Sequence, residues 1–386
     1  MQINPPPAFI NLTPSSVLSC LVGSTLLTLL AWIILKNNSS LKFVGKYISI
    51  LLAAVFIRMA LPVEFHFTKS FYSKHIMTAI MDFLDFKIGT ETYRLSVGQI
   101  LLALWITGAI FRLLSTVNKY IHFSYIIGRL PGYFKGNIQP IMDRINSELG
   151  RQSKFDIRLM PYLETPAIFG IMHPKILMPS THYTEDELYY ILKHEMLHYY
   201  HHDMLVKLFC EALCIIYWWN PCVFLLQKMV IKIIEVNVDN SVTCQLDEDG
   251  RNSYLKCILK SMRASKKIKA DFVITFSGSN VSSIRQRFEC ILDDYWAARK
   301  VRGACITVLS ILLFYISISI IIEAYYEIDI PGTFDYPTTE TSYLIKNGKY
   351  YDIYFEGKYV GDVLEITGPL KELKIYKEKE IPINEE

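Results

Sequence analysis

The residues best suited to chemistry lie in the segment His194-Glu195-Met196-Leu197-His198, which has the pattern H-E-x-x-H. On a helix, residues four apart lie one above the other, so His194 and His198 present two imidazole rings to one point. The carboxylate of Glu195 comes next to the first ring and can reach a water molecule bound at that point. The pattern therefore indicates a metal site of the zinc-peptidase kind, and the alternative is a surface helix with incidental His and Glu.

The helix that carries this segment has a start signal but lacks a third ligand. Thr184 and Glu187 stand in the S/T-x-x-E relation that opens helices. A catalytic zinc usually has three protein ligands and a water, so one ligand must come from elsewhere. Three ligands in a straight line along a helix cannot converge on one ion, so we interpret His201 and His202 as helix-end residues. The candidates for the third ligand are His201, His202, Asp203, Glu211, Glu235 and Asp239.

Two acids in a second predicted helix, over residues 232–239, are better placed. Glu235 and Asp239 are four residues apart and face the same way. One can bind the metal while the other accepts a hydrogen bond from the free ring nitrogen of a ligand histidine. The alternative is a pair of solvated acids, but most neighbours in this segment are apolar, and carboxylates among buried residues need partners.

The chain around these residues has the composition of a membrane protein with a water-exposed part. Of its 386 residues, 51% are hydrophobic and 20% are charged. A bilayer-spanning helix needs about 20 apolar residues. Four stretches meet this need, at about residues 17–35, 43–61, 95–117 and 304–322. For the second stretch, which contains Lys46 and Arg58, the alternative is a buried amphipathic helix.

The distribution of basic residues predicts the orientation. Lys and Arg cluster between the first two stretches, after the third and before the fourth, while residues before Val17 contain none. By the positive-inside rule, the amino terminus and the tail after Glu323 lie outside and residues 117–303 lie in the cytoplasm. Four basic residues in the predicted outer loop, residues 63–94, run against this rule. The first stretch lacks a basic leader and a clear cleavage site, which favours an uncleaved span over a signal peptide.

Cysteines and net charge exclude two further classes. The predicted outer segments contain no cysteine, so no disulfide framework is expected there. Cys210 and Cys214 are four apart on an apolar helix and are interpreted as packing residues. A formal net charge of +3 is too small to indicate direct binding of nucleic acid.

A helix with H-E-x-x-H followed by one with E-x-x-x-D resembles the gluzincin metallopeptidases. The finer resemblance, over roughly residues 15–325, is to the BlaR/MecR-type membrane metallopeptidases, bacterial sensor-transducers first known from antibiotic resistance. The four-span layout is similar as well. The matching pieces, in family order, are Pro166-Ala167-Ile168-Phe169-Gly170, Pro174-Lys175-Ile176-Leu177-Met178-Pro179, His194 to His198 with Asp203, Trp218-Trp219-Asn220-Pro221, Glu235 to Asp239, and Ser283-Ile284-Arg285-Gln286-Arg287-Phe288.

The resemblance implies a role for each site residue. His194, His198 and Glu235 would bind Zn²⁺, and Glu195 would polarise the attacking water. Asp239 would orient a ligand histidine, and Asp203 would be a structural hydrogen-bond acceptor. The family commonly has Cys directly before the Asp of the second motif, where this chain has Val238. Because that residue is not a ligand, we expect its packing to change and catalysis to survive.

The expected fold is an α-helical membrane protein with four transmembrane helices, an inserted α+β gluzincin-like zinc metallopeptidase domain and a small β-rich extracytoplasmic tail. The expected divisions are a three-span region (1–117), the cytoplasmic metallopeptidase domain (118–303), the fourth transmembrane helix (304–323) and the tail (324–386). Residues 155–160, 167–171 and 175–178 are predicted strands, one of which could pair with the backbone of a substrate. The apolar stretch 204–219 is predicted to be a buried or membrane-contacting helix.

The tail distinguishes this chain from the best-known family members, which end in a large penicillin-binding sensor. Only about 60 residues follow the fourth stretch, and the tail has no S-x-x-K, S-D-N or K-T-G motif. Covalent sensing of β-lactams by this chain is therefore not expected. Residues 343–365 are predicted hairpin strands, with Asn347-Gly348 as a strong turn signal and Glu356-Gly357 as a weaker one.

Three functions remain open at this stage. The first is a regulatory membrane zinc metalloendopeptidase that cleaves a cytoplasmic repressor of the BlaI/MecI type or its own inner loop. The second is a non-proteolytic signal transducer that retains the motif as structure. The third is a membrane quality-control metalloprotease of the HtpX/Ste24 kind. Expected partners are a protein or peptide substrate, the lipid bilayer and, as an open alternative, a second copy in a homodimer.

Overall fold

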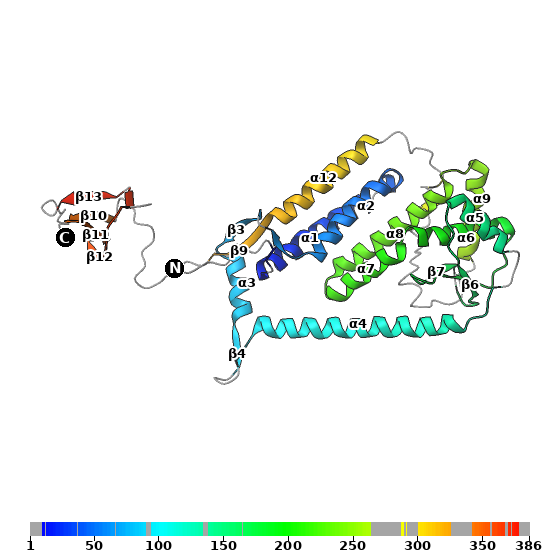
Figure 1. The fold of residues 1–386 in the computed structure, drawn as a ribbon, viewed down its shortest axis with the longest axis horizontal. Helices are drawn as coiled ribbons and strands as arrows, with labels where there is room; N and C mark the ends of the chain where they lie inside the picture. The colour runs from blue at the N-terminus through cyan, green and yellow to red at the C-terminus, as the bar shows by residue number, and fades with distance from the viewer. Residues whose placement is uncertain are drawn as a thin grey trace. The chain divides into compact units, whose positions relative to one another are not determined.

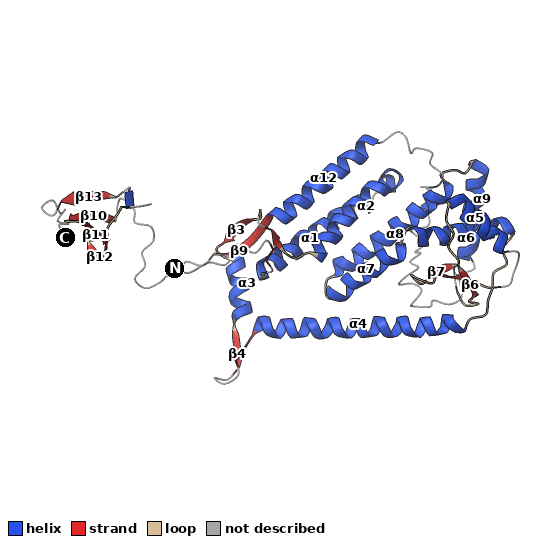
Figure 2. Cartoon of the chain, in the orientation of Figure 1, coloured by secondary structure: helices blue, strands red, loops and turns tan. Residues whose placement is uncertain are grey.

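A computed structural model of the chain is rich in helices and divides into two compact units, residues 1–325 and 326–386. Figure 1 traces the chain and Figure 2 shows its helices and strands. The structure describes residues 10–11, 13–36, 38–65, 67–89, 94–133, 138–163, 165–263, 287–288, 291, 300–325, 342–355, 357–366, 370–371 and 373–377. Of the residues singled out above, Ser283–Gln286 and Glu356 lie outside these ranges.

The four predicted spans fall on four helices. These are α1 (Pro14–Lys36), α2 (Asn38–Ala60), α4 (Val97–Arg129) and α12 (Lys300–Ser319). Among the described residues, α1 and α4 are long and apolar enough to cross a bilayer, whereas the apolar helical parts 49–60 and 307–319 are shorter. The fourth predicted span ends early, because residues 320–322 belong to strand β9 (Ile320–Ala324).

Helix α4 is longer than the span predicted within it. A capping box of Ser96 and Gln99 starts it, and its 33 residues extend over about 50 Å. That length exceeds the hydrocarbon core of a bilayer, about 30 Å. Toward the carboxyl end of α4, the rings of Tyr120 and Phe123 contact the ring of Phe169, with centroids 5.3 and 5.4 Å apart.

Helices α1, α2 and α12 pack side by side (Figure 1). The charged Arg58 of α2 is buried there, with 2% of its surface exposed. Its Nε donates to Ser317 Oγ at 3.2 Å and its Nη1 to the carbonyl of Leu61 at 3.1 Å. Arg58 is therefore accommodated by polar partners inside the bundle instead of facing lipid.

Helices α1 and α2 share one hydrophobic core with two helices of the inserted segment. Helices α7 (Asp203–Ile216) and α8 (Pro221–Thr243) contribute Leu213, Leu226 and Met229 to a cluster that also holds Leu27 of α1 and Leu51 of α2. Helix α7 is the apolar helix predicted at 204–219, and its Cys210 and Cys214 are buried. This core joins segments on both sides of residue 117, so packing does not mark a domain boundary there. The expected division at residue 117 stays a prediction.

A small mixed sheet lies beside the helices of the inserted segment. Its strands are β6 (Asp156–Leu159), β7 (Ala167–Phe169) and β8 (Lys175–Met178), in the order β6-β8-β7, close to the three predicted strands. Strand β8 is parallel to β6 and antiparallel to β7. Helices α5 (Ile138–Leu149), α6 (Glu185–Tyr200) and α9 (Glu248–Arg263) complete this part.

Short strands and one helix occupy the segment between α2 and α4. Strand β1 (Ile10–Asn11) pairs with β2 (Glu64–Phe65), and β4 (Lys87–Gly89) pairs with β5 (Arg94–Ser96). Strand β3 (Lys69–Ser73), which precedes α3 (Ile76–Asp85), pairs in parallel with β9 after α12. The loop predicted outside the membrane and the end of the last span are thus joined by a backbone ladder.

The second unit is a four-stranded sheet in the order β12-β11-β10-β13. Strands β10 (Ser342–Asn347) and β11 (Tyr350–Phe355) form the predicted hairpin, and Gly348 adopts a positive φ of 63° in its turn. Strand β12 (Lys358–Val363) adds the second hairpin, with Gly357 at φ 76°. Strand β13 (Lys374–Lys377) pairs in parallel with β10, which the sequence did not indicate.

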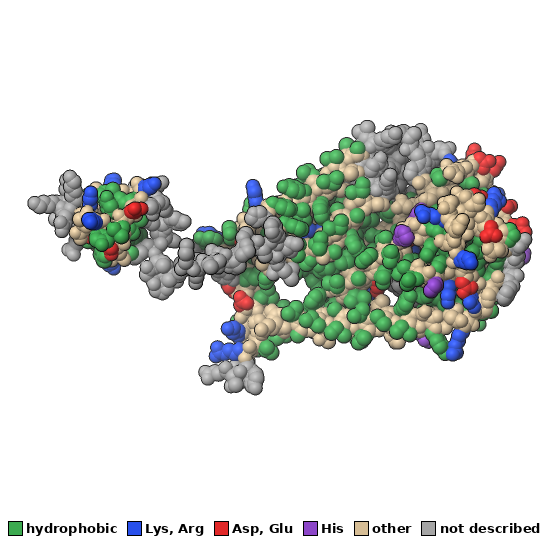
Figure 3. Space-filling view, in the orientation of Figure 1, with side chains coloured by type: hydrophobic (Ala, Val, Ile, Leu, Met, Phe, Trp, Pro, Cys, Tyr) green, Lys and Arg blue, Asp and Glu red, His purple; other side chains and the backbone are tan. Residues whose placement is uncertain are grey.

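Side chains are distributed as a membrane-embedded protein requires. On the face drawn in Figure 3, hydrophobic side chains cover α12, α1 and much of α4, whereas charged side chains gather over the end that holds α5, α6 and α9. Exposed apolar residues on α4 include Leu104, Phe111 and Leu114. Exposed apolar surface of this extent fits contact with lipid.

Candidate metal centre

Helix α6 begins where the start signal predicted. Thr184 is its N-cap, with its side chain accepting from the backbone N–H of Glu187 at 3.3 Å and Glu187 Oε2 accepting from the N–H of Thr184 at 2.8 Å. Burial alone would raise the pKa of Glu187, but Lys260, at 2.6 Å, and Thr184 outweigh burial and lower it. The capped helix carries both histidines of the H-E-x-x-H motif.

The two imidazole rings meet as the helical spacing requires. The Nε2 atoms of His194 and His198 are 3.1 Å apart, and the rings are nearly perpendicular. His198 is 4% exposed and Glu195, which follows His194, is 7% exposed. At this separation the two nitrogens can share a hydrogen bond when one is protonated, or bind one cation when both are neutral.

Helix α8 supplies the carboxylate that faces both rings. Glu235 places Oε2 3.6 Å from Nε2 of His194 and Oε1 3.5 Å from Nε2 of His198. Donor atoms of the three residues all lie within 4.8 Å of one another. Two ligand atoms bound to zinc at about 2.0–2.1 Å in tetrahedral geometry are about 3.3 Å apart, so separations of 3.1–3.6 Å fit a single zinc ion.

A sharp turn after α6 brings an acceptor to the second ring. His202 adopts a left-handed conformation, with φ 58°, and α7 begins at the next residue, Asp203. This reversal places Asp203 Oδ2 2.7 Å from Nδ1 of His198. The carboxylate thereby keeps the proton on Nδ1 and leaves the lone pair of Nε2 for a metal. His201 and His202 themselves are exposed, which agrees with their interpretation as helix-end residues.

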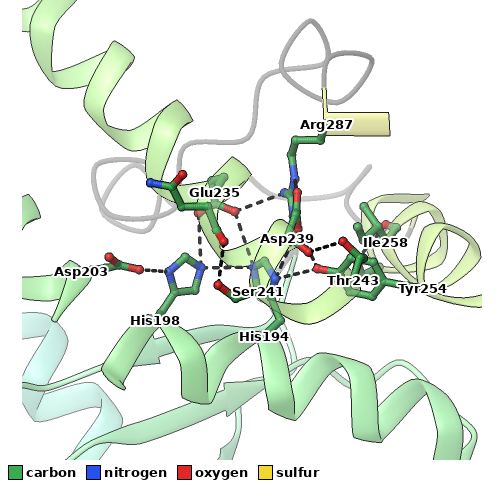
Figure 4. A network of polar contacts seen from close by, with 12 residues as sticks. His194, His198, Asp203, Glu235, Asp239, Ser241, Thr243, Tyr254, Ile258 and Arg287 are labelled. Carbon is green, nitrogen blue, oxygen red and sulfur yellow. Dashed lines mark hydrogen bonds and ion pairs between the residues drawn. The ribbon is translucent and has the colours of Figure 1, made fainter. Parts of the chain in front are cut away.

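The other ring is held through a tyrosine (Figure 4). The hydroxyl of Tyr254, on α9, lies 2.8 Å from Nδ1 of His194 and donates to Asp239 Oδ1 at 2.7 Å. The direct separation between Nδ1 of His194 and Asp239 Oδ1 is 3.5 Å. Asp239 was expected to orient a histidine directly. The shorter contacts run through Tyr254, while the direct contact between Asp239 and His194 is the longer one.

Comparison with known proteins decides the family. The profile of the BlaR1 peptidase M56 family matches residues 47–291, which is more than half of the chain. The chain belongs to this family. The matched region includes every residue of the site described above.

Two curated relatives illustrate the similarity. The regulatory protein BlaR1 of Bacillus licheniformis is 24% identical over 213 residues, which cover 55% of this chain and 35% of the relative. The methicillin resistance mecR1 protein of Staphylococcus aureus is 26% identical over 137 residues, covering 33% of this chain and 23% of the relative. The alignments thus span about a third or less of the length of these M56 relatives.

Glu211, the remaining candidate for the third metal ligand, forms hydrogen bonds between helices instead. Glu211, on α7, is buried at 6% exposure. Its Oε2 accepts from Gln227 Nε2 at 2.9 Å and its Oε1 from the hydroxyl of Thr116 at 3.4 Å. Glu211 therefore links α7 with α8 and α4, and its carboxylate is not among the grouped donor atoms.

Two residues of the M56 site were not predicted from the sequence. Tyr254 lies 15 residues beyond Asp239 and has no distinctive spacing to either motif. Arg287 belongs to a piece that resembles the family, but nothing in the sequence indicated its partners. In the structure its side chain lies against Asp239 and Glu235 (Figure 4).

The charges of the site stabilise one another in a buried setting. Burial alone would raise the pKa of Glu235, but His198, His194 and Arg287 outweigh it and hold the pKa well below the usual range. Burial would lower the pKa of His194, but Glu235, Asp239 and Glu195 outweigh it and raise the pKa. Burial and Asp239 raise the pKa of Tyr254 well above its usual value, so its hydroxyl keeps the proton that it donates.

Proposed function

We propose that this protein is an integral membrane zinc metalloendopeptidase that acts in signal transduction. The observation that carries the proposal is the convergence of His194, His198 and Glu235 at separations that fit one zinc ion, with Glu195 next in sequence to the first ligand. Membership of a peptidase family supports hydrolysis of peptide bonds as the reaction. Because the curated relatives extend well beyond the aligned region, their activities come to this chain only as part of the proposal.

The roles of the residues follow from their chemistry. Zinc held by the two imidazoles and Glu235 would lower the pKa of a bound water and polarise the scissile carbonyl. The carboxylate of Glu195 accepts the proton of the attacking water and delivers it to the leaving amine. Asp203 and Tyr254 hold the protons on the Nδ1 atoms of the two histidines, which directs both Nε2 atoms toward the ion.

Strand β7 is the edge that we propose for the substrate. The opposite edge of the sheet is covered, because the backbone N–H of Tyr133 donates to the carbonyl of Ile157 in β6 at 3.0 Å and Gly132 forms a β-bridge with Arg158. In the described part of the chain, β7 pairs only with β8. An extended peptide can add to such an edge through backbone hydrogen bonds, while α6, which contacts β7, presents the metal ligands.

The proposed orientation places the catalytic residues in the cytoplasm and the sheet of residues 342–377 outside. It rests on the basic residues that flank the helices, by the positive-inside rule. A cytoplasmic site could act on a repressor of the BlaI/MecI type or on the segment that precedes α12. Incubating the purified chain alone, and then with such a repressor, separates these substrates by the fragments that form.

The central test replaces Glu195 by Gln and compares it with Glu185→Gln, in the exposed first turn of the same helix. Both variants should bind one equivalent of zinc. Peptide hydrolysis should fall by about 10²–10⁴-fold for Glu195→Gln, the usual contribution of a general base, and stay at the native rate for the control. Native hydrolysis by zinc-loaded Glu195→Gln would refute the proposed role of this carboxylate. Normal signalling in cells that carry the variant would favour a non-proteolytic transducer.

A further inference from the structure

A single guanidinium connects the two carboxylates of α8. Arg287 Nε donates to Asp239 Oδ2 at 2.6 Å, and its Nη2 donates to Asp239 Oδ1 at 2.7 Å. Its third nitrogen, Nη1, lies 3.2 Å from Glu235 Oε2. The side chain of Arg287 is 10% exposed, and those of Asp239 and Glu235 are 2% and 16% exposed. A planar fork of this kind fixes both the position and the plane of the carboxylate that it binds.

These contacts close a ring around the metal position. Starting from Nδ1 of His194, hydrogen bonds run through Tyr254 to Asp239 and on to Arg287. Arg287 forms an ion pair with Glu235, whose Oε2 faces Nε2 of His194 at 3.6 Å. A proposed ligand from α6 and one from α8 are therefore held by the same chain of contacts. Without the guanidinium, two buried carboxylates one helical turn apart would repel each other and lose their fixed geometry.

The residue that closes the ring comes from the segment before α12. Phe288 and Ile291, which follow Arg287, pack in a hydrophobic cluster with Leu197 of α6 and Val238 of α8. Ile291 is 5% exposed. Apolar contacts thus hold Phe288 and Ile291 against the two helices that carry the proposed ligands, independently of the ionic contacts.

We propose that Arg287 is a positioning residue for the third zinc ligand, and that metal binding depends on the packing of Phe288 and Ile291 against α6 and α8. This inference rests on the proposed zinc site but not on the identity of any substrate. The guanidinium makes two short bonds to Asp239 and one longer contact to Glu235, so Asp239 takes up most of its charge. We therefore expect its main effect on metal binding to be to hold Glu235 in place, not to repel the ion.

The test measures zinc affinity by competition with a chelator, using the full chain in detergent. Arg287→Met should weaken zinc binding by about 10- to 100-fold, the range found when groups that orient metal ligands are lost. Arg287→Lys keeps the charge without the planar fork and should recover part of that loss. Arg144→Met, which removes a guanidinium that is paired with Glu148 on the surface of α5, should leave zinc affinity unchanged. Ile291→Ala should weaken binding less than Arg287→Met.

A second measurement separates positioning from a purely structural role. If Arg287 positions Glu235, the rise in melting temperature on adding zinc should shrink in Arg287→Met, whereas a structural role would lower the melting temperatures with and without zinc equally. Native or tighter zinc binding by Arg287→Met would overturn the proposal. Native affinity in Ile291→Ala would overturn its second half. Because binding is measured apart from hydrolysis, a zinc-binding native chain that cleaves no peptide would contradict the proposed function and leave this inference standing.

Discussion

The hydroxyl of Tyr254 offers a direct test of how the site holds its first histidine. Replacing Tyr254 by Phe removes one oxygen and keeps the ring. Nδ1 of His194 then loses its acceptor at 2.8 Å, while Asp239 loses one donor at 2.7 Å and keeps the two from Arg287. Since Asp239 Oδ1 is already 3.5 Å from Nδ1, a small shift of the ring restores part of the contact.

The expected cost follows from these distances. Loss of a group that orients a metal ligand usually weakens metal binding by 10- to 100-fold. Asp239 stays paired and lies near Nδ1 of His194, the nitrogen that loses its partner. We therefore expect the lower end of this range, a weakening of zinc binding by about 10-fold, or about 1.4 kcal/mol. Zinc affinity measured by chelator competition checks this, with Tyr190→Phe as the control. The ring of Tyr190 packs 5.7 Å from that of Tyr254 and keeps its place in the variant. Equal affinities for the two variants would show that the tyrosine contact does not support the metal site.

Three further changes test the site and its setting. Asp203→Asn should weaken zinc binding by about 10-fold or more in the same assay, because the acceptor at the second histidine loses its charge. Gly108→Ala should lower the melting temperature in detergent, since the added Cβ would lie 2.3 Å from the ring of Trp218, whereas Gly128→Ala, with open space, should not. Glu187→Gln keeps the capping box but removes the charge that pairs with Lys260 in the first turn of α6, so it should cost about 1 kcal/mol of unfolding free energy at pH 7. Because the folded pKa of Glu187 is lowered, the stability from its charge is lost as the pH falls through that lowered pKa, so the cost should vanish in acid titrations of stability.

Short-range sequence patterns predicted most of the helices and strands and the pairing of the two histidines. The relation between Thr184 and Glu187 set the start of α6, and the spacing of His194 and His198 placed both rings together, because helical geometry fixes such contacts. The four apolar stretches and the three strands were located from hydropathy and residue type. Asn347-Gly348 predicted a hairpin because glycine readily adopts the positive φ that the turn requires.

The partners of the ligands could not be predicted, because they come from distant elements. Tyr254 and Arg287 reach Asp239 from α9 and from the segment before α12, and no local spacing encodes those contacts. The sequence favoured Glu235 and Asp239 over the other candidates, but spacing alone did not decide which of the two binds the metal. That choice depends on how α6 and α8 cross, which periodicity does not determine. Orientation in the membrane stays a prediction from charge.

The ladder between β3 and β9 determines how a load on the carboxyl-terminal sheet would travel. Five consecutive residue pairs, from Lys69 with Ile320 to Ser73 with Ala324, join the chain directly after α12 to the segment before α3. The N–H of Tyr325 extends the ladder by bonding to the carbonyl of Ser73 at 3.1 Å. A force applied through residues beyond 325 would therefore act first on these backbone hydrogen bonds, and only then displace α12 along its own axis. Because β3 precedes α3 and α4 in the chain, the same force would also reach the connection toward α4.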